Sequence, residues 1–105
     1  MVSLYLMAGK EVNIDARIFR KTNNLSSKID NELVILNVNK GEYNGLDEIG
    51  SDIWNQLESP MILSDLIAKL VEKYNVNEQQ CTLDVIDFIT ELEKAGLISI
   101  ENEIK

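Results

Sequence analysis

Apolar and polar residues alternate in short runs between Leu25 and Leu46, and a period of two predicts β-strands. Tight turns are expected at Asp30-Asn31 and at Asn39-Lys40-Gly41, because Asp, Asn and Gly tolerate left-handed backbone angles. The pattern therefore predicts a three-stranded antiparallel meander. Its expected strands cover residues 25–29, 32–38 and 42–46.

Beyond Leu46 the apolar positions recur every three or four residues, which predicts helices. Asp47 suits the N-cap of the first helix, and Gly50 within it leaves room for another element to approach closely. Ser64 is the expected N-cap of the second helix, and Gly96 suits the C-terminal stop of the third. The expected helices and the strand after them cover residues 47–57, 65–74, 78–95 and 97–100.

The first 24 residues leave two interpretations open. Val12, Ile14, Ala16 and Ile18 alternate with polar residues as in a strand, but an extended arm along the domain fits equally well. A chain of 105 residues supports one domain with a small core. We expect an α+β, winged-helix-like domain, a three-stranded antiparallel β-meander followed by three α-helices. The expected parts are an N-terminal arm or extra strand at 1–24, the domain at 25–100 and a polar tail at 101–105.

Charge is distributed unevenly along the chain. The formal net charge is −8, to which residues 1–40 contribute +2 and residues 41–105 contribute −10. An acidic helical half repels phosphate backbones and anionic lipid, so nucleic acids and membranes are not expected partners. The simpler explanation, which we favour, is that these carboxylates form a solvated face.

The residue types that catalysis needs are scarce. The chain has no histidine, which removes the commonest general base, and its one cysteine, Cys81, suits a small core residue. No glycine spacing fits a phosphate-binding loop. A single cysteine fits a reducing compartment, and the N-terminus resembles neither a signal peptide nor a membrane span. We therefore predict a cytoplasmic protein without enzymatic activity, catalytic residues, cofactor or metal.

DNA binding by the third helix fails on charge. That helix would enter the major groove of DNA and should carry Lys or Arg on its exposed face. Residues 78–95 instead hold five carboxylates and one basic residue, Lys94. A protein- or peptide-binding module is the class that remains.

A longer pattern carries a family resemblance. Residues 36–57 read Leu-Asn-x-x-x-Gly-x-Tyr-x-Gly-Leu-Asp-x-x-Gly-x-x-Ile-Trp-x-x-Leu. The segments at 66–74, 84–92 and 95–98 extend this pattern, so that it covers about residues 25–100. The motifs resemble those of PqqD-like proteins. In that family the domain is the recognition element of pathways that make ribosomally synthesised and post-translationally modified peptides (RiPPs).

The resemblance implies a non-catalytic adaptor. Such a protein captures the leader peptide of a ribosomally synthesised precursor by strand addition and presents the precursor to modifying enzymes. Free-standing copies of this length are similar to recognition proteins of lasso-peptide biosynthesis, whose partners are a leader peptidase and a cyclase. The alternative is a recognition component of a radical-SAM peptide maturase, as in pyrroloquinoline quinone biosynthesis. A winged-helix DNA-binding regulator is a third and less favoured function.

The resemblance also implies a binding groove between the third strand and the third helix. The leader peptide would pair with the edge strand, where the N–H of Asn44 is a candidate outward-pointing donor. On the helix, one stripe at spacings i, i+3, i+4 and i+7 would form the other wall. Taken singly, each apolar residue of this stripe suits the core better than a ligand contact. The implied peptide-binding residues are Glu42, Tyr43, Asn44, Gly45, Leu46, Cys81, Asp84, Val85 and Phe88.

Other residues have simpler expected roles. Trp54 is expected to anchor the first helix to the sheet, and Tyr43 to pack at the sheet edge or against an aromatic residue of the leader. Four basic residues either form an edge for acidic leader residues or a partner enzyme, or are simply solvated, which we favour. They are Arg17, Arg20, Lys21 and Lys28, while Ile86, Ile89 and Leu92 are expected in the core.

Overall fold

The computed structural model describes residues 4–7, 10–22, 24–30 and 32–102. Within these ranges the strands form three small antiparallel sheets, ordered β1-β2, β7-β3-β8 and β4-β5-β6. The expected α+β fold, with a three-stranded meander followed by three helices, is confirmed. The elements are β1 (Leu4–Met7), β2 (Lys10–Asn13), β3 (Arg17–Arg20), β4 (Asn24–Ile29), β5 (Glu32–Asn37), β6 (Glu42–Leu46), α1 (Glu48–Gln56), β7 (Met61–Ile62), α2 (Leu63–Tyr74), α3 (Glu78–Lys94) and β8 (Ile98–Glu101).

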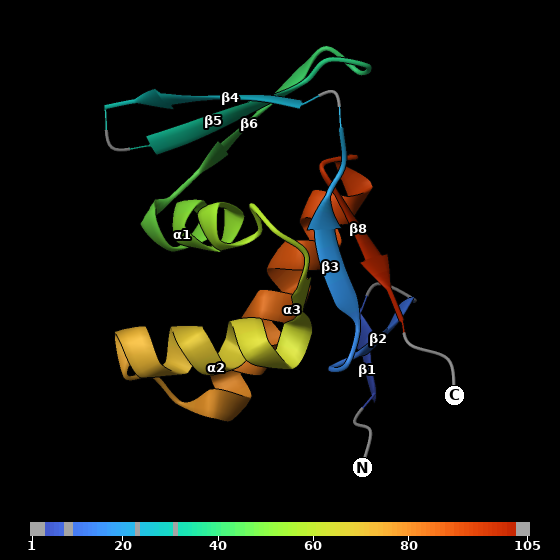
Figure 1. Ribbon diagram of the computed structural model, residues 1–105, viewed down its shortest axis with the longest axis vertical. Coiled ribbons are helices and arrows are strands. Elements are labelled where there is room, and N and C mark those ends of the chain that lie inside the picture. The colour runs from blue at the N-terminus through green and yellow to red at the C-terminus, as the bar shows by residue number, and fades with distance from the viewer. Residues whose placement is uncertain (1–3, 8–9, 23, 31, 103–105) are drawn as a thin grey trace.

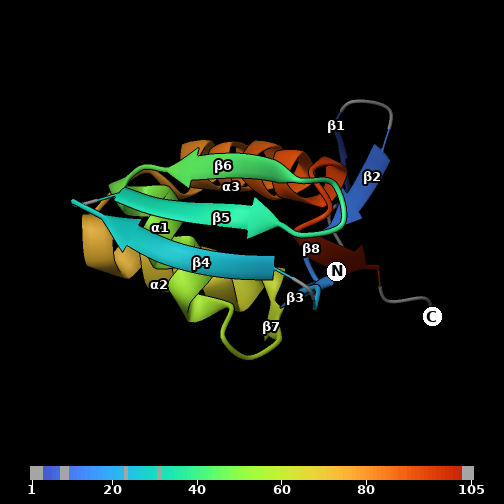
Figure 2. The same ribbon diagram turned by 90° about the horizontal axis from the view of Figure 1, so that it is seen from above.

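One face of the β4-β5-β6 meander packs toward the helices. Figure 1 shows this sheet above α1, and Figure 2 looks down on its other face, which no element covers in that view. Ile35 and Leu46 are buried on the face toward the helices. On the outer face, Leu25, Leu36 and Tyr43 lie directly opposite one another across the three strands. This outer row is exposed at both ends, since Leu25 and Tyr43 are 62% and 73% accessible.

The alternating residues from Val12 to Ile18 belong to two strands rather than one. The alternation that starts at Val12 is interrupted by a turn at Ile14-Asp15, and the chain then re-enters a strand as β3. β3 lies between β7 and β8, with Ile18 opposite both Met61 and Ile100. Val12, Ala16 and Ile18 are fully buried. The segment thus contributes to the core in which the helices pack.

Two of the three expected helix signals are confirmed and one is wrong. The Asp47 carboxylate accepts the N–H of Gly50 at 2.7 Å, as an N-cap does. Ser64 does not cap α2. The helix already begins at Leu63, and no side chain caps it. Its first N–H groups instead donate to the backbone carbonyls of Ala16 (2.8 Å) and Ile14 (2.9 Å). A distant turn therefore supplies the acceptors that a capping side chain would otherwise provide.

The end of α3 is a Schellman motif built on Gly96, as the sequence predicts. The N–H of Gly96 donates to Glu93 and that of Leu97 to Leu92, both at 3.0 Å. Gly96 has φ +78°, and a Cβ there would lie 2.7 Å from the side-chain nitrogen of Asn37. Asn37 is buried and donates to the carbonyl of Ala95 at 2.8 Å. Glycine is needed here both for the backbone angle and for the approach of Asn37.

Trp54, Ile86, Ile89 and Leu92 are all buried in the core, as expected. The guanidinium of Arg20 lies 4.5 Å from the centre of the Trp54 ring and donates from Nε (3.1 Å) and Nη2 to the Trp54 carbonyl. Burial lowers the pKa of Arg20, and the negative charge of Glu58 partly offsets this decrease. Arg20 therefore has a structural role and differs from the exposed Arg17, Lys21 and Lys28.

Gly96→Ala is expected to lower the free energy of unfolding by about 2 kcal/mol, because alanine is strained in the left-handed region and its Cβ meets Asn37. Urea unfolding followed by circular dichroism measures the change. The matched control is Gly45→Ala, where a Cβ has nothing within 4 Å and the backbone is not left-handed. Equal stability of the two variants would show that the Gly96 turn is not strained by a side chain.

Candidate peptide-binding groove

One edge of the meander is open beside α3. Among the described residues, β6 pairs with β5 and with no other strand. A hollow separates β6 from the C-terminal half of α3, and we call it the strand hollow. Figure 2 shows β6 as the strand of the meander that lies nearest to α3. The strand hollow is lined by Lys40, Glu42, Tyr43, Asn44, Gly45, Leu46, Phe88, Glu91, Leu92, Lys94 and Ala95.

The hairpin turn determines which backbone groups of β6 point outward. A two-residue hairpin turn closes on a hydrogen-bonded pair, here Ile29 and Glu32. Hydrogen-bonded pairs then alternate along each strand, so we infer that residues 33, 35 and 37 of β5 bond to β6. Since Asn44 lies opposite Ile35, its N–H points inward. The outward-pointing groups belong to Tyr43 and Gly45, which corrects the expectation for Asn44.

A second hollow, which is mostly apolar, adjoins the first at Phe88. It lies among the start of α1, the end of α2 and the first half of α3, with a volume of about 450 Å³. Phe88 lines both hollows, so the two meet at its ring. We call this second space the apolar hollow, and the two together the groove. The apolar hollow is lined by Asp47, Ile49, Gly50, Ile53, Leu70, Tyr74, Val76, Asn77, Gln80, Cys81, Asp84, Val85 and Phe88.

The position of Phe88 depends on Gly50. A Cβ at residue 50 would lie 3.0 Å from Cζ of the Phe88 ring, closer than side chains normally pack. The expectation that Gly50 permits close approach of another element is therefore confirmed, and that element is α3. The half-buried ring rests against the first turn of α1, between the two hollows.

The structure brings the predicted residues together on one groove. The five residues of β6 line the strand hollow, while Cys81, Asp84, Val85 and Phe88 line the apolar hollow. Cys81 and Val85 are only 8% and 4% accessible, so each offers a small surface to the groove. Their part in binding a peptide stays a prediction.

Sequence reasoning missed the contributions of α1 and of the α2–α3 junction. Ile49, Tyr74 and Val76 line the apolar hollow, and none was predicted there. The sequence does contain a signal for two of them. Ile49 is an apolar residue in the first turn of a helix, and Val76 is an apolar residue in a polar loop. Both are nearly half exposed, at 48% and 45%. Apolar residues at such positions indicate a surface that is covered only when a partner binds.

Cys81 does not have the environment of a reactive thiol. Its pKa is raised, first by burial and then by the nearby carboxylates of Asp84 and Glu78. The thiol is therefore protonated at neutral pH and contributes a small apolar surface. Across the described part of the chain, no three His, Cys, Asp or Glu side chains are placed to hold a metal ion. In that same part, no helix combines the length and apolarity needed to cross a bilayer.

Tyr74 is held in place from the far side of the groove. Its hydroxyl donates to the Asp52 carboxylate at 2.8 Å, and Lys73 Nζ donates to the same oxygen at 2.7 Å. Burial alone would raise the pKa of Asp52, but the hydrogen bonds from Lys73 and Tyr74 outweigh burial and lower it. The hydrogen bond to Asp52 raises the pKa of Tyr74. These bonds join α1 to α2 and fix the ring that closes one side of the apolar hollow.

Asp52→Asn is expected to destabilise the protein more at neutral pH than at about pH 3. A carboxyl whose pKa is lowered on folding contributes stability above its ordinary pKa, and this contribution is lost as pH falls through the lowered value. Urea unfolding of both proteins across this range measures the difference. Glu72→Gln, at an exposed carboxylate of α2, is the control. A destabilisation by Asp52→Asn that does not change with pH would contradict the assignment.

Comparison with known proteins identifies one family and two similar structures. A family profile described as Coenzyme PQQ synthesis protein D (PqqD) matches residues 32–98. No curated protein sequence matches the chain. A structure of TbiB1 in complex with the TbiA(beta) leader peptide is 29% identical with a TM-score of 0.71, covering 83% of this chain and 99% of that one. Lasso peptide synthetase B1 complexed with the leader peptide is 21% identical with a TM-score of 0.65, covering 78% and 96%, and shows the fold alone.

Proposed function

Since the chain belongs to the PqqD family, we propose that it is an adaptor that binds the leader peptide of a ribosomally synthesised precursor. The observation that carries this proposal is the open edge of β6 beside a groove walled by α3. An exposed strand edge is a liability for aggregation unless it is short, covered or used. Adding a peptide strand satisfies the outward backbone groups and fills the groove at once.

The bound peptide runs antiparallel to β6 in this proposal. Backbone groups of Tyr43 and Gly45 pair with the peptide and supply affinity that depends little on sequence. Side chains of the peptide that point inward meet Phe88 and the rest of the α3 stripe, which supplies register. An apolar peptide side chain enters the apolar hollow, whose lining is formed largely by aliphatic and aromatic residues. The same mode is consistent with the two similar structures, both of which are complexes with a leader peptide.

The adaptor acts by proximity rather than by chemistry. Holding the leader raises the effective concentration of the remainder of the precursor at a bound enzyme. We propose lasso-peptide biosynthesis as the pathway, with a leader peptidase and a cyclase as partners, because a free-standing chain of this length resembles the recognition proteins of that pathway. A radical-SAM maturase is the alternative, supported by the family description. We place the protein in the cytoplasm, where precursors are translated, and propose no catalytic activity of its own.

A DNA-binding regulator fits the groove less well. The exposed side of α3 carries Glu78, Asp84, Asp87 and Glu91, and contact with a phosphate backbone would set like charges against each other. No observation on the helix favours this function over peptide binding.

Tyr43→Pro tests strand addition, because it removes an outward N–H that a bound peptide needs as a donor. We expect affinity for synthetic leader peptides, taken from precursors encoded near the gene, to fall at least about tenfold. Isothermal titration calorimetry measures the affinity. Tyr43→Ala is the matched control, since it removes the same side chain and keeps the N–H. If the two variants bind equally, the outward edge of β6 is not the binding element.

Phe88→Ala tests the groove wall. Removing the ring where the two hollows meet should weaken leader binding by about tenfold or more, as expected for a central aromatic contact. Leu83→Ala is the control, because Leu83 is an exposed apolar residue of α3 outside both hollows. Thermal unfolding of both variants separates stability from affinity. Loss of stability with unchanged affinity of the folded protein would assign Phe88 to the core alone.

A further inference from the structure

The two ends of the groove differ in charge. Asp47 and Asp84 line the apolar hollow, and no Lys or Arg is among its described lining residues. The strand hollow instead balances Lys40 and Lys94 against two carboxylates, Glu42 and Glu91. One end of the groove is therefore acidic and the other end is balanced.

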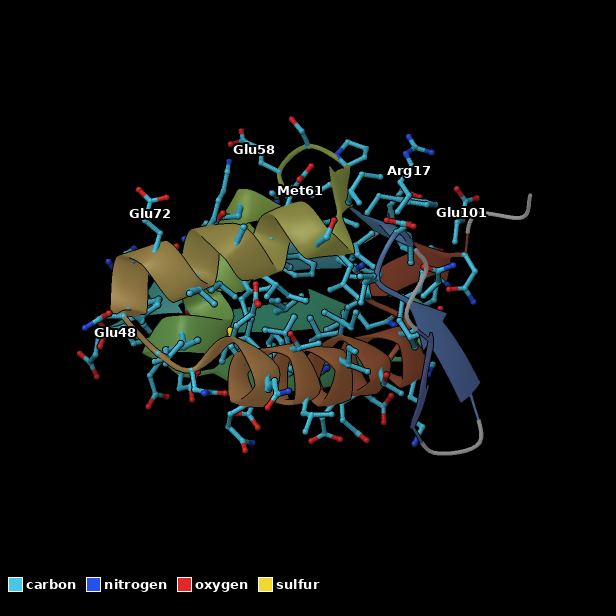
Figure 3. All side chains as sticks on the ribbon, turned by 90° about the horizontal axis from the view of Figure 1, so that it is seen from below. Arg17, Glu48, Glu58, Met61, Glu72 and Glu101 are labelled. Carbon is cyan, nitrogen blue, oxygen red and sulfur yellow. The ribbon has the colours of Figure 1, made fainter. Side chains whose placement is uncertain are left out.

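Two further carboxylates affect residues that line the apolar hollow. Glu48 is close enough to affect Tyr74 electrostatically, and Glu78 affects Cys81 in the same way. Figure 3 places Glu48 at the end of the molecule opposite to the ion pair of Arg17 with Glu101. Asp47 and Asp84 thus line the apolar hollow and Glu78 lies near its Cys81, whereas Glu48 lines a separate hollow together with Lys28 and Lys73.

The groups that contact these carboxylates do not neutralise them. Asp47 accepts the backbone N–H of Gly50, and Asp84 accepts the neutral side chain of Gln80 at 2.9 Å. The N-termini of α1 and α3 lie nearby, but each contributes only about half a positive charge. Lys73, 5.4 Å from the centre of the Tyr74 ring, is paired with Asp52 and lines a separate hollow. Among the described residues, Asp47 and Asp84 therefore have no ion pair with a Lys or Arg side chain.

We infer that the groove selects peptides that contain a large apolar residue preceded, on the N-terminal side of that residue, by Lys or Arg. This inference rests on the proposed function and names the chemical class of its ligand. The apolar residue fills the apolar hollow, and the basic residues reach the surrounding carboxylates. A peptide that offers only apolar side chains leaves those carboxylates without a cation.

The position of the basic residues in the peptide follows from the antiparallel pairing proposed above. A peptide antiparallel to β6 has its N-terminal part beside Leu46, and Leu46 leads directly into Asp47 at the apolar hollow. Its C-terminal part then passes Lys40 and Lys94, about four residues further along at 3.4 Å per residue. A parallel peptide would instead have its C-terminal part at the apolar hollow, and its basic residues would then lie on the C-terminal side. The antiparallel orientation proposed above therefore places the basic residues on the N-terminal side.

Selection of random dodecapeptides displayed on phage, with the intact protein as bait, tests the inference without a known ligand. Enriched peptides are expected to carry Lys or Arg within about three residues N-terminal to an aromatic or large aliphatic residue. Synthetic copies of the enriched peptides are then titrated by fluorescence anisotropy, and amide shifts of residues 42–46 report whether they join β6.

The double substitution Glu78→Gln and Asp84→Asn is expected to weaken these peptides by about three- to tenfold, and added salt should narrow the difference. Asp87→Asn is the matched control, because Asp87 is an exposed carboxylate of α3 outside both hollows. Its effect should be less than about twofold. Circular dichroism verifies that all variants are folded.

The outcomes separate this inference from the proposed function. One contrary result is a set of enriched peptides that shift the amide signals of residues 42–46 without an excess of Lys or Arg. Another is a set with that excess on the C-terminal side of the apolar residue. Either result would overturn the inference and leave strand addition intact. Equal weakening by Asp87→Asn and by the double variant would also overturn it. A selection without enrichment, or peptides that leave residues 42–46 unshifted, would overturn the proposed function itself.

Discussion

The groove depends on one buried amide, that of Asn37. Its nitrogen donates to the carbonyl of Ala95 at 2.8 Å, and its oxygen accepts the N–H of Lys40 at 3.1 Å. Lys40 in turn donates from Nζ to the carbonyl of Lys94 at 3.0 Å. The β5–β6 turn is thereby bonded to the last turn of α3, and the spacing between strand and helix at that end is set by directional bonds. A buried amide left without these partners would cost about 1–3 kcal/mol, so few alternative spacings compete with this one.

The other end of the groove is set by packing. Phe88 rests on Gly50, and Tyr74 is held by Asp52 on α1. The first turn of α2 takes its hydrogen-bond acceptors from Ile14 and Ala16, so the N-terminal strands also position the helix that carries Tyr74. The shape of the groove therefore depends on the whole fold, although its predicted walls are one strand and one helix.

The sequence predicts those parts of the structure that local chemistry decides. Asp47 caps its helix and Gly96 ends one because each acts on backbone groups within three or four residues. Ser64 fails as a predictor because its helix is capped by carbonyls some fifty residues away, which no local pattern encodes. The strand and the α3 stripe were recognisable from family motifs. Ile49, Tyr74 and Val76 were not, because tertiary packing alone brings their three segments together.

The outer face of the meander changes when a peptide binds in the groove. Leu25, Leu36 and Tyr43 form a row that is exposed at both ends and stops at the open edge of β6. A peptide added to that edge extends the row by one strand, at about 4.8 Å per strand. The empty and the loaded protein then differ in the width of an uncovered sheet face, as well as in the contents of a groove. An enzyme that contacts this face would recognise occupancy as a change in shape, without touching the apolar hollow.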